Sequence, residues 1–195
     1  GVAEYQQTAA LWIRGILEHD FGVSQYKIHW YMERSEEMSH GGATGFKPPP
    51  GISFNRIEKN NSLASTLLAN ELDVAHVASP WVLQANALDR SSRIGGSDWS
   101  KIMPLFPDRM AEATRFHKKH GFLPVNHTYI IRGDIYKKYP WVAFNLYTGF
   151  VKAKALARQK MLEQIPSALF FGPEYAAMTR DRIGDDPFPY GIKAN

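Results

Sequence analysis

The stretch Gly121-Phe-Leu-Pro-Val-Asn-His-Thr-Tyr-Ile-Ile-Arg132 places one histidine, His127, in the middle of an extended segment. Residues 128–131 have the composition of a short apolar strand, and a helix is expected to begin near Pro140. Imidazole titrates near neutral pH, so a histidine held on stiff backbone is the main candidate for proton transfer in this chain. The alternative is a buried histidine that only hydrogen-bonds a backbone carbonyl.

The composition is that of a globular protein able to bury a core, with 195 residues, 44% of them apolar and 13% aromatic. Lys and Arg number 23 against 19 Asp and Glu, and the positive charges are scattered, so nucleic-acid binding is not indicated. A mildly basic balance suits a small anionic ligand and equally describes an ordinary solvated surface. No apolar run approaches the roughly 20 residues that a membrane span needs.

The chain contains no cysteine. Disulfides, thiol nucleophiles and cysteine metal sites are therefore excluded, and the cytoplasm and the periplasm both stay open as compartments. The first residue is Gly1 rather than methionine, so the sequence gives no argument about a targeting segment.

Residues 4–19 have the apolar spacing of a helix, and Gly22 is expected to end it. Tyr5, Gln6 and Thr8 lie near its start, where unpaired N–H groups and the helix dipole favour a carboxylate. The alternative is that the polar residues there simply cap the helix.

The rest of the chain alternates helices and strands. We expect strands at 26–31, 52–57 and 74–78, helices at 62–72, 109–120, 141–158 and 173–182, and a loop at 33–51. A helix followed by a strand that ends at Ser79-Pro80 is typical of α/β proteins, in which ligands gather at the carboxyl ends of strands. Ser79 is therefore a candidate ligand contact, although Ser-Pro is also common turn chemistry.

His117 and His120 lie three residues apart on a predicted helix, which raises the question of a metal site. Lys118 and Lys119 stand between them and no third ligand is evident, so a solvated basic face is the favoured interpretation.

Three blocks resemble one family: residues 1–15, Leu-Phe-Pro-Asp at 105–108, and the segment from Phe122 through His127 to the Tyr-Pro-Trp-Val at 139–142. Together they are similar to the 4,5-dihydroxyphthalate decarboxylase family, which is itself similar to type 2 periplasmic binding proteins for thiamine precursors, nitrate and taurine. The resemblance extends through essentially the whole chain. It departs from the pattern at Ala3, where the family has proline, and in residues 38–50, which leaves the exact substrate open.

The resemblance implies an α/β, two-lobed fold like that of type 2 periplasmic binding proteins, with mixed sheets flanked by helices. In this family the opening motif lies inside the protein, so the resemblance implies that the chain is an interior fragment. Residues 1–125 would form the second lobe. Residues 126–195 would form the return segment and helices of the first lobe.

The implied activity is cofactor-independent decarboxylation of a hydroxylated aromatic dicarboxylate such as 4,5-dihydroxyphthalate, without metal, in the cytoplasm. The expected partner is the small anionic aromatic substrate, with no nucleic acid or membrane, and assembly into a homo-oligomer stays open. The alternative is a periplasmic solute-binding protein of an ABC transporter for a small anionic or aromatic compound. A metal-dependent hydrolase that uses His117, His120 and His127 is the least favoured hypothesis.

Within the decarboxylase hypothesis, His127 is the predicted acid–base residue, with Glu33 as the alternative. Arg14 would hold a substrate carboxylate together with the helix start at Tyr5, Gln6 and Thr8. Arg14 could instead pair with an acidic residue on the surface.

Overall fold

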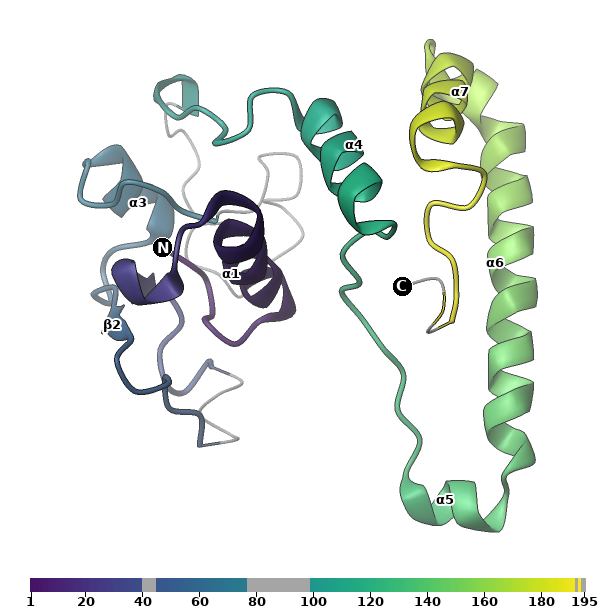
Figure 1. Cartoon of the computed structure of the whole chain (residues 1–195), viewed down its shortest axis with the longest axis horizontal. Helices are drawn as coiled ribbons and strands as arrows, with labels where there is room; N and C mark the ends of the chain where they lie inside the picture. The colour runs from purple at the N-terminus through teal and green to yellow at the C-terminus, as the bar shows by residue number, and fades with distance from the viewer. Residues whose placement is uncertain (40–44, 77–98, 192, 194–195) are drawn as a thin grey trace. The chain divides into compact units, whose positions relative to one another are not determined.

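The computed structural model describes residues 1–39, 45–76, 99–191 and 193 (Figure 1). The described part is rich in helices and contains a small parallel sheet. The chain divides into two compact units, Gly1–Pro107 and Asp108–Asn195. The predicted lobe boundary at residue 125 falls inside the second unit, and the assignment of lobes stays a prediction. Across the described residues, no helix combines the length and the apolar character of a membrane span.

The first unit is built on a parallel array of short extended segments. Strand β1 (His29–Met32) pairs with β2 (Ser53–Arg56). On the opposite edge of β1, the Val2 N–H donates to the Tyr31 carbonyl at 2.9 Å, and the Glu33 N–H donates to the Val2 carbonyl at 3.0 Å. Residues 74–76 lie along the first residue in turn, because the His76 N–H donates to the Gly1 carbonyl at 2.8 Å. The N-terminal residues thus hydrogen-bond to the segment that includes β1 on one side and to residues 74–76 on the other.

This pairing explains why the first helix starts later than predicted. Helix α1 (Thr8–Phe21) begins four residues later than the predicted start at residue 4. The reason is that the backbone of residues 2–3 hydrogen-bonds to the segment that includes β1. Its end at Gly22 confirms the prediction, and φ of 69° at Gly22 is a conformation that glycine adopts at little cost.

The other predictions for this unit are confirmed in part. The strand expected at 26–31 begins only at His29, since Ser24 caps a 3₁₀ helix, η1 (Gln25–Lys27), before it. The strand expected at 52–57 is β2. Helix α3 (Leu63–Leu68) is shorter than the expected 62–72, as Asn70 takes a φ of 59° and breaks it. Residues 74–76 are not a regular strand, and 77–78 lie outside the described residues. A 3₁₀ helix, η3 (Trp99–Lys101), lies near the end of the unit.

The core of the first unit lies on the two faces of this array. One face buries an aromatic and aliphatic cluster, and the Tyr5 ring meets the edges or faces of Trp30 and Phe54 in T-shaped pairs at 5.4 and 5.7 Å. The other face buries Ala3, Ile57, Leu63 and Leu72. Because successive residues of an extended segment point to opposite faces, Val2 and Ala3 reach different clusters.

A buried ion pair connects the start of the chain to the segment after β1. Arg34 Nη1 lies 2.8 Å from Glu4 Oε2, with the two side chains 5% and 0% exposed. Ser39 Oγ donates to Glu4 Oε1 at 2.5 Å, and Gln6 Nε2 donates to the same oxygen. The carboxylate therefore keeps hydrogen-bond donors on both oxygens, as a buried charge requires.

The second unit is helical. Helix α4 (Arg109–His120) has the predicted bounds, with Asp108 capping it through the Ala111 N–H at 2.8 Å. Residues 123–132 have no regular structure, so the strand predicted at 128–131 is wrong. Its central side chains, Tyr129 and Ile130, are 78% and 92% exposed. A strand needs a neighbour to pair its backbone groups, and none of the described residues supplies one.

Three further helices complete this unit. The short α5 (Gly133–Lys138) was not expected, whereas α6 (Trp141–Ala168) follows Pro140 as predicted and runs ten residues beyond the expected end. Residues 159–164 are mostly good helix formers, which explains the extension. Helix α7 (Gly172–Ile183), predicted at 173–182, turns back against α6 (Figure 1). Lys154 anchors the tail through Asp186 at 2.6 Å, and this hydrogen bond holds the pKa of Asp186 below its ordinary value.

We predict that Arg34→Met strongly destabilises the protein, because the Glu4 carboxylate would stay buried without its cation. The free energy of unfolding, from chemical denaturation, should fall by about 3–5 kcal/mol. The matched control is Arg132→Met, which removes an exposed arginine paired with exposed Asp134 and should leave the denaturation curve unchanged. Equal effects of the two substitutions would contradict the structural role of the buried pair.

Candidate functional site

The candidate site is the start of helix α1. Along α1, backbone hydrogen bonding begins at Leu11, whose N–H donates to the Gln7 carbonyl at 3.0 Å. For residues 8–10, no acceptor lies among the described residues, and the N-cap Gln7 contributes no side-chain hydrogen bond. The simple capping alternative is therefore wrong. The unpaired N–H groups and the positive end of the dipole favour an anion here.

Arg14 brings a buried positive charge to the same end of the helix. Its side chain leans toward the N-terminus, as helical side chains do, and Nη1 donates to the Tyr5 carbonyl at 2.5 Å. The residue is 8% exposed, and no described carboxylate lies within ion-pair distance of it. The alternative of a surface ion pair is wrong. Burial lowers the pKa of Arg14, which means that the charge is held at a cost in hydration.

An aromatic wall surrounds this guanidinium. Its central carbon lies 3.9 Å from the centroid of the Tyr5 ring and 5.9 Å from that of Trp30. The Tyr5 hydroxyl donates to Gln25 Oε1 at 2.9 Å, which fixes the ring, and Phe46 packs at 6.0 Å from it. Burial raises the pKa of Tyr5 more than the nearby Arg14 lowers it. A cation beside aromatic rings is suited to an anion carried on a flat apolar body.

Gln6 presents a second unsatisfied group near the helix start. Its Nε2 donates to Glu4 and contacts Ser39 Oγ at 3.3 Å, which fixes the orientation of the amide. Its Oε1 is buried and has no hydrogen-bond partner. Since Arg34 compensates Glu4, this acid does not neutralise Arg14. No local sequence pattern indicates the Glu4 and Arg34 pair, because the two residues are thirty positions apart.

Glu33, the alternative acid–base residue, is engaged elsewhere in the first unit. It is 1% exposed, and its Oε2 accepts a hydrogen bond from the Leu63 N–H at 2.6 Å. Leu63 is the first residue of α3, so this carboxylate satisfies a backbone donor that helix geometry leaves open. The arrangement accounts for the buried Glu33 by a structural role.

His127 lies in the irregular segment of the second unit and is exposed. The alternative of a buried histidine bonded to a carbonyl is therefore wrong, and no hydrogen bond or ion pair joins His127 to another described residue. Its role as an acid–base residue stays a prediction. Tyr5, Gln6, Thr8 and Arg14 come together at one helix end, whereas Ser79 lies outside the described residues.

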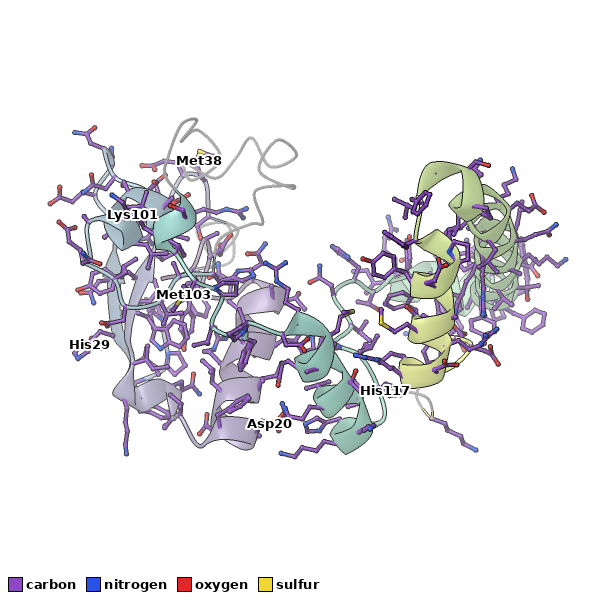
Figure 2. The ribbon with its side chains drawn as sticks, turned by 90° about the horizontal axis from the view of Figure 1, so that it is seen from above. Asp20, His29, Met38, Lys101, Met103 and His117 are labelled. Atoms are coloured by element: carbon purple, nitrogen blue, oxygen red, sulfur yellow. The ribbon has the colours of Figure 1, made fainter. Side chains whose placement is uncertain are left out.

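Of the two histidines of α4, His120 takes part in aromatic packing. Figure 2 shows His117 on this helix. The His120 ring lies 4.4 Å from the ring of Phe116, which in turn meets Phe122 in a T-shaped pair at 5.6 Å. Nowhere in the described ranges do three or more potential metal ligands gather. Aromatic packing explains the position of His120 at the end of the helix.

Comparison with known proteins gives one consistent relationship. No family model matches the chain. A 4,5-dihydroxyphthalate decarboxylase from Comamonas testosteroni is 25% identical over 198 residues, a match that covers 100% of this chain and 56% of the relative. A protein of the same name from Pseudomonas putida is 32% identical over 73 residues, which cover 37% of this chain and 28% of the relative. The chain thus spans little more than half of the first relative, and it is a distant homologue of 4,5-dihydroxyphthalate decarboxylase.

Proposed function

We propose that the chain contributes to a cofactor-independent decarboxylase that acts on a hydroxylated aromatic dicarboxylate such as 4,5-dihydroxyphthalate. The observation that carries the proposal is the similarity to a protein of that name along the whole chain. The chemistry at the start of α1 supports it, because an uncompensated cation, unpaired N–H groups and aromatic side chains meet there.

In this proposal one substrate carboxylate binds Arg14 and the N–H groups of residues 8–10. The anion would replace the water that a buried guanidinium has lost, so binding recovers part of the cost of burial. Tyr5 and Trp30 would border the aromatic ring. Gln6 offers its unpartnered Oε1 to a hydroxyl group, and Thr8 lies at the first position of the helix.

The proposed reaction exchanges a carboxylate for a proton on the ring. The ring carbon gains a C–H bond from an acid, with electrons fed in by a phenol oxygen. The C–C bond to the carboxylate then breaks, its electron pair restores the aromatic system, and CO₂ leaves. We propose His127 as the acid, because imidazolium can donate near neutral pH and is then reprotonated from solvent.

The finer fold proposal follows the same relationship. It is a two-lobed α/β arrangement like that of type 2 periplasmic binding proteins, with residues 1–125 in one lobe and 126–195 in the other. The helices and the parallel sheet of the described residues are compatible with it. We place the decarboxylase in the cytoplasm. A solute-binding protein would use the same anion site without the chemistry, since fold alone does not decide function.

We predict that Arg14→Met weakens the binding of phthalate, an unreactive analogue, about a hundredfold in the complete protein, as measured by titration calorimetry. Its unfolding midpoint should change little, because no described carboxylate would lose a partner. The control Lys27→Met removes an exposed positive charge of the same unit and should leave affinity unchanged. Wild-type affinity in Arg14→Met would exclude the proposed anion site.

We predict that His127→Gln lowers CO₂ release from 4,5-dihydroxyphthalate at least about a hundredfold and leaves phthalate binding intact, because glutamine hydrogen-bonds but does not titrate. The control is His117→Gln, on α4.

The two readouts separate the candidate functions. Tight binding without CO₂ release by the wild type would favour a solute-binding protein. If the wild type is active and His127→Gln turns over normally, His127 is not the acid, and the proposed decarboxylation itself is not contradicted.

A further inference from the structure

A cavity made entirely of residues of the second unit lies where α7 folds back on α6. Its volume is about 220 Å³. One side is the last part of α6, and the other side is formed by α7 and the residues that follow it. The volume equals about seven water molecules at roughly 30 Å³ each, which is room for one six-membered ring with a small substituent.

The turn between the two helices closes one wall of this cavity. Gly172 begins α7, and a side-chain carbon added there would collide with Ile165 Cγ2 and lie 2.9 Å from the Ile165 carbonyl oxygen. The backbone of the turn therefore packs directly on α6. The close approach sets the spacing of the helices on either side of the cavity.

The lining combines an apolar floor, whose side chains are about half exposed, with positive charge at the rim. Met161, Leu162 and Leu169 contribute apolar side chains, and Arg158 and Arg180 are exposed. Arg158 makes no hydrogen bond or ion pair with another described residue. The nearest acid to Arg180 is the exposed Asp181 at 3.9 Å, a separation at which an ion pair is weak.

Among the lining residues, guanidinium groups outnumber carboxylates. Asp185 is the one acid in the lining. The neighbouring Asp186 accepts a hydrogen bond from Lys154 at 2.6 Å, and the charge of Arg158 also lowers its pKa. The lining itself therefore carries two guanidinium groups and one carboxylate.

We propose that this cavity binds a small carboxylic acid whose apolar body is about the size of one ring. The body lies on the apolar floor, and the carboxylate faces the guanidinium groups of Arg158 and Arg180. Apolar burial supplies most of the affinity, while the charges select an acid over a neutral compound of the same shape. The inference does not depend on the proposed decarboxylation.

The test uses the complete protein labelled with ¹³C-methyl methionine, and 4-fluorobenzoate as the probe. The Met161 methyl signal, assigned with Met161→Leu, should shift until the site is saturated, while that of Met32, buried in the first unit, should not. The neutral isostere 4-fluorobenzyl alcohol should bind about tenfold more weakly. A Met161 signal that stays unchanged at millimolar probe would overturn the proposal, as would equal affinity for the alcohol.

Matched variants test whether Arg158 and Arg180 bind the carboxylate of the probe. The double substitution Arg158→Gln with Arg180→Gln should weaken binding of 4-fluorobenzoate about tenfold, as expected for the loss of two exposed charge contacts. Arg182→Gln makes the same change on α7 outside the lining and should have no effect. Arg14→Met should leave the Met161 shift intact. A shift lost in Arg14→Met, or kept at full affinity in the double variant, would contradict this site.

Discussion

The arrangement of the first unit depends on the ion pair between Glu4 and Arg34. Both side chains are buried, and the carboxylate is satisfied by Arg34, Ser39 and Gln6 together. A buried pair of this kind adds little net stability over apolar residues, yet loss of one partner is costly. Its effect is to specify one arrangement of the N-terminal residues against β1, from which α1 then starts.

The same pair decides the electrostatics at the start of α1. Because Glu4 is paired with Arg34, this buried acid does not compensate Arg14. Arg14 is held instead by a backbone carbonyl and the Tyr5 ring, neither of which carries a full negative charge. In the proposed function this buried cation binds an anion, and the aromatic side chains around it border the apolar body of that anion.

The second unit is held together by contacts between helices. Its long helix α6 buries no residue, and α7 is held against it by a tight turn at Gly172 and a tail anchored through Asp186. The segment with His127 has no strand partner among the described residues, and its side chains Val125, Tyr129 and Ile130 remain exposed. A segment with the composition of a strand forms one only where a neighbouring segment can pair with it.

Local sequence determined the features that depend on local physics. Gly22 ends α1 as expected and Gly121 ends α4, because each takes a positive φ, and Asp108 caps α4 through its own side chain. The helix dipole also predicts from the sequence that the start of α1 favours a carboxylate, and this site stays a proposal. Long-range pairing decided the rest. The later start of α1, the burial of Arg14 and the compensation of Glu4 by a residue thirty positions away all depend on which segments lie side by side, which no single stretch of sequence encodes.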